Sequence, residues 1–207
     1  DDNQLSRLLD WADVVCIGCG LGMGQISEKI LKNVLKNVSC PCVIDADGLN
    51  LLNGKIELLN QCRAPVILTP HMKEMSRLTG WSIDKIMEDR FQALDQIIKQ
   101  SGPDRKSSII CVLKDSRTVV AQTNRQKFVN LAGNNSMAKG GSGDVLAGTI
   151  AGLLAQHMAP FEAAAVGVFL HACGGDEAKK SKGSYSVLAR DLIQGMADAM
   201  KNAKECR

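Results

Sequence analysis

Short apolar runs alternate with amphipathic stretches along the first half of the chain, and this alternation constrains the fold more than any other feature. The runs read VVCI, CVID, PVIL and IICVL, at residues 14–17, 42–45, 65–68 and 109–113. Between them, hydrophobic residues recur at helical spacing, first as Ile26, Ile30, Leu31, Val34 and Leu35 and later as Ile83, Ile86, Met87, Phe91, Leu94 and Ile97. Short apolar strands that alternate with helices predict βαβ units around a buried parallel sheet.

The pattern changes after Leu113. Two short runs, 118–121 and 127–130, are joined by the polar turn TNRQ and indicate a hairpin added to the sheet. From residue 144 onward the chain is rich in Ala and Leu, and we expect three helices there. Their expected ranges are 144–157, 161–179 and 188–203. Because no linker, repeat or low-complexity segment interrupts the chain, we expect one α/β domain over residues 1–207.

The composition excludes several classes of protein. With 45% hydrophobic and 23% charged residues among 207, general disorder is excluded. The net charge of +3, without a dense Lys/Arg block, argues against nucleic acid as a partner. No apolar run reaches the roughly 18 residues of a membrane helix, so we expect no membrane partner. Seven aromatic residues and 19 glycines favour a small ligand held close to the backbone.

The eight cysteines do not indicate a disulfide framework. Cys16, Cys42 and Cys111 lie inside apolar runs, where a free thiol behaves as a small buried hydrophobe. Cys16 and Cys19 have zinc or redox spacing, but no second pair follows, and Cys40 lies too close to Cys42. We therefore expect free thiols and a cytoplasmic location.

Ligands of open parallel sheets bind at the carboxyl ends of the strands, and the loops there carry unusual residues. The loop at 18–24, GCGLGMG, lacks the third glycine of a dinucleotide fingerprint and the Lys of a P-loop. It is either a tight strand-to-helix turn or a backbone surface that approaches a ligand. In the next loop, Asp45 and Asp47 can meet a metal-bound phosphate, or Asp47 can cap a helix.

The third loop contains His71 and Glu74. His71 is placed for ligand contact, or it is a loop histidine bonded to the backbone. Glu74 can orient a metal-bound water, or it can favour the positive end of the following helix. The other two histidines, His157 and His171, fall on apolar helix faces, where a core or interface role is expected.

The fourth loop, GNNSMAKGGSGD at 133–144, leads into a helix and is the strongest candidate site. Glycines before a helix leave its first N–H groups free to bind an anion, and the helix dipole favours negative charge there. Asp144 is either an N-cap or a base that accepts the proton of a hydroxyl attacking a phosphoryl group. A serine-hydrolase motif fails because Asp144 stands where it needs Gly, so Ser142 is expected to be a donor in this cradle.

Several motifs of this chain resemble those of a known protein family. GGSGDVLAG resembles the GGTGDxLAG signature of the ribokinase-like superfamily. With CIGCGLG, VIDADGLNLL, LTPHMKEMSRL, VLKDSRT and LHACGGD in this order, nearly the whole chain is similar to the ADP/ATP-dependent NAD(P)H-hydrate dehydratases. The resemblance implies a ribokinase-like α/β fold, with a mostly parallel central sheet, helices on both faces and a small hairpin. In this family a strand, a Gly-rich turn and helices precede the segment where this chain begins, so we expect an N-terminal part of the domain to be missing.

The resemblance also implies an activity. The S-epimer of hydrated NADH or NADPH would be phosphorylated on its ring hydroxyl by ADP or ATP, with ADP the expected donor and Mg²⁺ as cofactor, and phosphate would then be eliminated. The expected partners are this hydrate and the adenine nucleotide, with self-association into a homo-oligomer and an epimerase as further partners. One alternative is a ribokinase-like kinase of a sugar or vitamin alcohol, and another is a catalytically inactive nucleotide-sensing module.

By motif position, the resemblance assigns Asp144 as the catalytic base and as a substrate contact. Gly20 and His71 match the other substrate contacts, and Glu74 matches a residue that organises Mg²⁺ through water. The nucleotide-binding positions are Lys114, Asp115, Ser116, Arg117, Thr118, Gly141, Ser142 and Gly143. Where the family reads KGAGT this chain reads KDSRT, which leaves the preference for ADP or ATP open.

Overall fold

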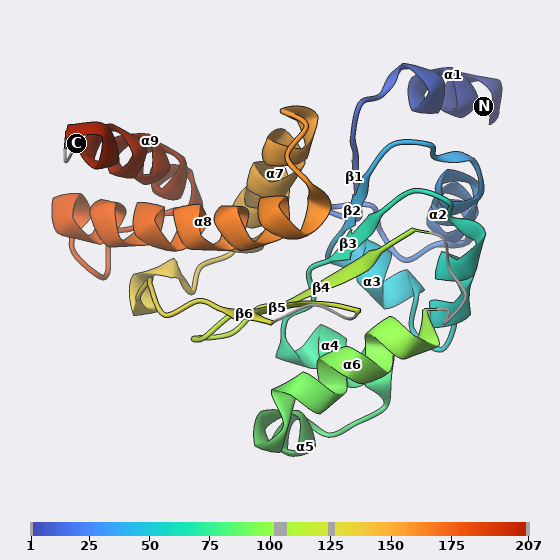
Figure 1. Cartoon of the computed structure of the whole chain (residues 1–207), viewed down its shortest axis with the longest axis horizontal. Coiled ribbons are helices and arrows are strands. Elements are labelled where there is room, and N and C mark those ends of the chain that lie inside the picture. The colour runs from blue at the N-terminus through green and yellow to red at the C-terminus, as the bar shows by residue number, and fades with distance from the viewer. Residues whose placement is uncertain (1, 102–106, 124–126, 206–207) are drawn as a thin grey trace.

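The computed structural model describes residues 2–101, 107–123 and 127–205 (Figure 1). Its sheet has six strands in sequential order, of which the first four are parallel and the last two antiparallel. The strands are β1 (Val15–Ile17), β2 (Cys42–Ile44), β3 (Val66–Leu68), β4 (Ile109–Leu113), β5 (Val119–Gln122) and β6 (Phe128–Val129). The mostly parallel sheet and its hairpin are thus confirmed, while residues 124–126 of the TNRQ turn lie outside the described residues.

Helices cover both faces of this sheet (Figure 1). The first face carries α1 (Asp2–Trp11), α2 (Gln25–Asn37), α3 (Asp47–Leu51), the 3₁₀ helix η1 (Ile56–Gln61), α4 (Met72–Thr79), α5 (Ile83–Glu88) and α6 (Arg90–Gln100). After β6 come the 3₁₀ helix η2 (Asn135–Met137), α7 (Ser142–Ala155), α8 (Pro160–Lys182) and α9 (Ala189–Glu205). Helices α7 and α8 pack on the second face, and α9 packs mainly on α8.

The apolar runs are explained by burial of the central strands on both faces. In β3, Val66 and Leu68 join the core under the first group of helices, whereas Ile67 joins the core under α7 and α8. Successive side chains of a strand point to opposite faces, so a strand covered on both sides is apolar throughout. Burial of Cys42 and Cys111 is confirmed, and none of the seven described cysteines forms a disulfide.

One expectation is corrected, and the helical spacing of one stretch is confirmed in two helices. Cys16 is exposed, because β1 is the edge strand of the described sheet and only its alternate residues Val15 and Ile17 pack on the core. The periodic stretch from residue 83 to 97 forms two helices, since Asp89 ends α5 and caps α6 by accepting a hydrogen bond from the Gln92 N–H at 2.9 Å.

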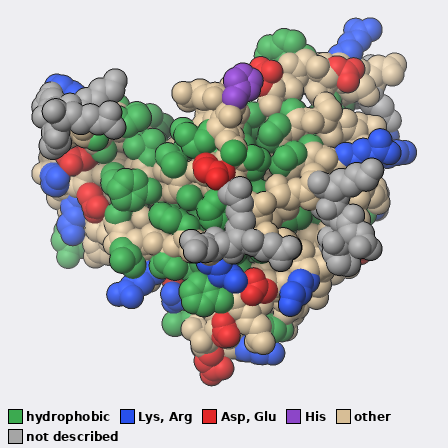
Figure 2. Space-filling model, in the orientation of Figure 1, with side chains coloured by type: hydrophobic (Ala, Val, Ile, Leu, Met, Phe, Trp, Pro, Cys, Tyr) green, Lys and Arg blue, Asp and Glu red, His purple; other side chains and the backbone are tan. Residues whose placement is uncertain are grey.

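The long helices α8 and α9 carry exposed hydrophobic side chains, among them Val166, Phe169, Ile193 and Met200. Figure 2 shows hydrophobic side chains gathered over this part of the molecule. Within the described ranges, no helix combines the length and the hydropathy needed to cross a membrane.

Candidate functional site

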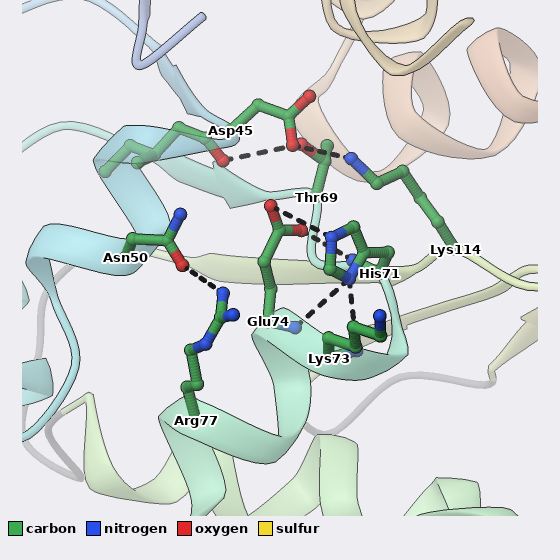
Figure 3. Close-up of polar contacts among 9 residues, drawn as sticks. Asp45, Asn50, Thr69, His71, Lys73, Glu74, Arg77 and Lys114 are labelled. Atoms are coloured by element: carbon green, nitrogen blue, oxygen red, sulfur yellow. Dashed lines mark hydrogen bonds and ion pairs between the residues drawn. The ribbon is translucent and has the colours of Figure 1, made fainter. Parts of the chain in front are cut away.

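The loops that follow the parallel strands meet at one edge of the sheet, and a partly buried ion pair joins two of them. Asp45 follows β2, and Lys114 follows β4. Lys114 Nζ lies 2.6 Å from Asp45 Oδ1, with side chains that are 18% and 2% exposed (Figure 3). The backbone of Lys114 also pairs with that of His71, which follows β3. The sheet therefore brings together, at its carboxyl edge, residues that follow three neighbouring parallel strands.

The N-terminus of α7 lies against this ion pair. A Cβ atom added to Gly143 would stand 3.3 Å from Lys114 Nζ and 3.5 Å from Asp45 Oδ2. Gly141 is the N-cap of the helix, and no side chain caps it. Asp144 instead lies in the first turn, so the alternative in which it is the N-cap is wrong. By helix geometry the first N–H groups of α7 lack intrahelical acceptors, which leaves positive potential beside the Asp144 carboxylate.

Asp144, Asp45 and Cys19 form a cluster at the same place. One ligand atom from each lies within 4.8 Å of the other two. Desolvation and then a hydrogen bond with Asp144 raise the pKa of the Cys19 thiol to about 12, so the thiol is protonated at neutral pH. Carboxylate oxygens suit a hard cation such as Mg²⁺, whereas a protonated thiol does not. The two aspartates therefore fit a divalent ion bound with a phosphate, and the protonated Cys19 thiol lies beside them.

His71 and Glu74 form a capping box at the start of α4. His71 Nδ1 accepts hydrogen bonds from the N–H groups of Lys73 and Glu74, at 3.0 and 3.1 Å. Glu74 Oε2 in turn accepts from the His71 N–H at 2.8 Å, and Oε1 lies 3.5 Å from His71 Nε2 (Figure 3). The backbone hydrogen bonds expected for His71 and the position expected for Glu74, at the positive end of α4, are therefore confirmed. The His71 side chain is still 48% exposed, so the contact to a substrate stays a prediction, as does the Mg²⁺ role of Glu74.

The Gly-rich loop after β1 is tied to the loop after β2. Asp47 Oδ2 accepts a hydrogen bond from the Gly22 N–H at 2.8 Å, and the N-cap of α3 is Ala46, so capping by Asp47 is wrong. A Cβ atom on Gly18 would stand 1.8 Å from the backbone oxygen of Asp45. Gly18 therefore forms a tight turn, whereas a Cβ on Gly20 would meet no heavy atom within 4 Å.

The turn after β4 contains the five predicted nucleotide-binding positions 114–118. Asp115 forms an ion pair with Arg90 of α6 at 2.7 Å, and its backbone oxygen accepts from Thr118 Oγ1 at 3.1 Å. Ser116 and Arg117 are exposed, and Arg117 lines a pocket with Met87 and Phe91. Among the described residues of this turn, Lys114 is the one whose side chain reaches the cluster of Asp144, Asp45 and Cys19, through its ion pair with Asp45. The nucleotide roles of the other four residues stay predictions.

Two residues of α8 that the sequence did not assign to the site contact its loops. His171 Nε2 lies 3.3 Å from Ser142 Oγ, although the expected role of His171 was in the core. Asp176 accepts hydrogen bonds from Asn134 Nδ2 at 2.7 Å and from the Gly133 N–H at 3.1 Å, and so anchors the loop that precedes α7. The available signal was the LHACGGD motif, which contains both residues.

Comparison with known proteins gives consistent findings. A family model described as NAD(P)H-hydrate dehydratase matches residues 1–197. The bifunctional NAD(P)H-hydrate repair enzyme Nnr of Moorella thermoacetica is 39% identical over 99% of this chain and 37% of its own length. The ADP-dependent (S)-NAD(P)H-hydrate dehydratase of Neisseria meningitidis is 38% identical over 90% of this chain and 62% of its own. The chain thus spans less than two thirds of either curated relative.

The fold also has solved counterparts. The ADP/ATP-dependent NAD(P)H-hydrate dehydratase of Bacillus subtilis, co-crystallised with ATP/Mg²⁺ and soaked with CoA, superposes with a TM-score of 0.77 at 26% identity. The match covers 96% of this chain and 71% of the Bacillus chain. Together with the sheet order and the helices on both faces, it supports the ribokinase-like architecture.

Proposed function

The chain belongs to the NAD(P)H-hydrate dehydratase family, and from this premise we propose that it restores the S-epimer of hydrated NADH and NADPH to the normal cofactor at the expense of ADP or ATP. The relatives above 30% identity named here are hydrate-repair enzymes, which favours this activity over the kinase of a sugar or vitamin alcohol. The observation that carries the proposal is the position of Asp144, in the first turn of α7 and within 4.8 Å of Asp45.

The proposed reaction has two steps. The hydroxyl group that hydration added to the nicotinamide ring attacks the terminal phosphoryl group of the nucleotide, Asp144 takes the hydroxyl proton, and the shortened nucleotide leaves. Loss of phosphate and of a ring proton then restores the double bond. The amides of Gly141 and Gly143 and the hydroxyl of Ser142 surround the place where phosphoryl charge develops, and Lys114 adds a positive charge beside Gly143.

The remaining predicted residues fall into two groups. Gly20 and His71 would contact the hydrated dinucleotide, because both are open to solvent at this edge of the sheet. Lys114, Asp115, Ser116, Arg117 and Thr118 would contact the nucleotide. Asp45 and Asp144 would hold Mg²⁺, with Glu74 acting through water, and the ion when bound would neutralise phosphoryl charge.

The partners of the chain are part of the proposal. Exposed Val166 and Phe169 on α8 support association with a second copy, which light scattering of the purified protein measures. The relative from Moorella is named as bifunctional, which supports an epimerase as a functional partner. The absence of a disulfide among the seven described cysteines is consistent with a cytoplasmic enzyme.

The test is recovery of NADH absorbance when the protein is incubated with hydrated NADH, Mg²⁺ and either ADP or ATP. We expect recovery that depends on nucleotide, and the comparison of ADP with ATP gives the preferred donor. Asp144→Asn should lower the rate by about 10²–10⁴-fold, since it removes the general base. Phosphate transfer to another alcohol without NADH recovery would favour the kinase. Nucleotide-dependent thermal stabilisation without any turnover would favour the inactive sensing module.

A further inference from the structure

Ser142 has two hydrogen-bond donors, its backbone N–H and its side-chain hydroxyl, and only the hydroxyl can be directed to a ligand. Its backbone N–H donates to the Lys139 carbonyl oxygen at 3.2 Å, although it stands at the first position of α7, where an anion would be bound. The donor that remains is the side-chain hydroxyl. Ser142 Oγ lies 3.3 Å from Nε2 of His171, so the direction of the hydroxyl hydrogen depends on this ring.

His171 is a buried side chain reaching the site from α8, with 8% of the residue exposed. Burial lowers its pKa to about 4, the charge of nearby Lys114 acts in the same direction, and hydrogen bonding to the Ser142 backbone opposes them. The ring is therefore neutral at pH 7, with one nitrogen protonated and the other bare. A neutral ring donates at Nε2 in one tautomer and accepts there in the other.

Only one of these tautomers suits an anion. If Nε2 were bare, it would take the Ser142 hydroxyl hydrogen, and Oγ would present lone pairs to a phosphate. If Nε2 carries the hydrogen, it donates to Oγ and leaves the hydroxyl hydrogen free to point to a phosphoryl oxygen. The buried ring then fixes the position of Oγ and adds no charge of its own.

We propose that His171 is a positioning residue that donates from Nε2 to Ser142 Oγ and thereby directs the Ser142 hydroxyl to the terminal phosphoryl group of a nucleoside di- or triphosphate. This inference rests on the proposed function, because it assumes that the N-terminus of α7 binds that group. It differs from the general-base role of Asp144, since His171 acts through Ser142 and does not touch the reacting atoms.

The first experiment is nitrogen NMR of the imidazole in the unaltered protein at pH 7, which distinguishes a protonated from a bare Nε2. We expect a neutral ring with hydrogen on Nε2. A bare Nε2 or a charged ring would overturn the proposal. This measurement requires neither turnover nor a folded variant, so it stays informative if the proposed reaction is wrong.

The second experiment measures ADP affinity by calorimetry, together with kcat and KM, for Ser142→Ala, His171→Leu and the double variant. Each single substitution should lower kcat/KM by about 10–100-fold. The kcat/KM of the double variant should be no lower than that of Ser142→Ala, because the two substitutions remove the same contact to the phosphoryl group. His171→Gln, whose amide N–H can donate to Oγ, should recover most of the loss. Independent, multiplicative losses would overturn the proposal.

The matched control is His157→Gln, which removes an imidazole just beyond the opposite end of α7 and should leave ADP affinity unchanged. Thermal unfolding of each variant checks that it is folded. If NADH recovery is absent from the unaltered protein while ADP affinity still depends on Ser142 and His171, the proposed reaction fails but the positioning role stands.

Discussion

The ammonium group of Lys114 lies 2.6 Å from Asp45 Oδ1 at the edge of the sheet where β2 and β4 end. These residues are 69 positions apart in the sequence and come together because parallel strands end at one edge. Asp45 is almost fully buried, so its charge depends on this partner for compensation. The ion pair therefore contributes to the stability of the fold and sets the charge next to the N-terminus of α7.

Lys114→Met should reduce the free energy of unfolding by about 3 kcal/mol, because it leaves a buried carboxylate without its cation. Urea denaturation at pH 7 measures the change. Lys32→Met is the matched control, since Lys32 forms an ion pair of 2.7 Å with Glu28 on the exposed surface of α2 and should matter far less. Equal losses for the two variants would contradict the importance given to burial.

Gly18→Ala and Gly20→Ala should separate the two roles left open for the Gly-rich loop. Gly18 has φ +123° and a Cβ there would clash with the Asp45 backbone, so we expect a loss of about 3 kcal/mol or more. Gly20 has φ +69° and open space around it, so its replacement should cost about 1 kcal/mol. Thermal unfolding measures both changes.

Ligand affinity completes that comparison. If Gly20 contacts the hydrated dinucleotide, Gly20→Ala should raise the KM for hydrated NADH while the protein stays folded. An unchanged KM would assign this part of the loop a structural role alone. The stability of Gly18→Ala relative to Gly20→Ala is informative either way, because it depends on backbone contacts and not on the ligand.

The sheet could be predicted from the sequence because burial on both faces leaves a local signal. Every residue of β3 is apolar, and so is every residue of β4, since each side chain meets a core on one face or the other. The short helices α3 and α4 left only residues at their N-terminal ends as a signal, because they span five and eight residues and have little room for periodicity. Cys16 looked like a core residue because strand sequence does not reveal which strand is at the edge.

The candidate site was predictable in its loops but not in its contacts. The strand ends and the glycines before α7 are local features, and they placed Asp45, His71 and Asp144 at one edge of the sheet. The contact of His171 with Ser142 depends on how α8 packs on α7, 29 residues away in the sequence. The apolar pattern of the helix gives no sign of such a contact, because a buried neutral histidine is compatible with a hydrophobic environment, and the family motif LHACGGD marks this part of α8 without naming the partner of His171.

His71→Asn should separate the capping role of His71 from a role in binding. Asn is a good N-cap, so the free energy of unfolding should change little, whereas His71→Ala should lose about 1 kcal/mol. If the exposed imidazole also contacts the substrate, both variants should raise the KM for hydrated NADH. An unchanged KM in His71→Asn would mean that His71 only caps α4. Urea denaturation measures the free energy of unfolding, and steady-state kinetics measures the KM.

Stability should fall in mild acid because of His171. An unfolded histidine has a pKa near 6.5, whereas burial lowers the pKa of His171 in the folded protein to about 4. Above pH 6.5 both states are neutral at this residue, and below it the unfolded state binds the proton first, so the free energy of unfolding decreases as the pH falls towards 4. At pH 5 the loss from this group is about 2 kcal/mol, since one pKa unit corresponds to about 1.4 kcal/mol.

The variant His171→Gln tests this prediction because it lacks the ionisable group. The difference in free energy of unfolding between the unaltered protein and this variant should change by that amount between pH 7 and pH 5, as measured by urea titrations. Parallel pH profiles would mean that the ring is protonated as readily in the folded as in the unfolded state.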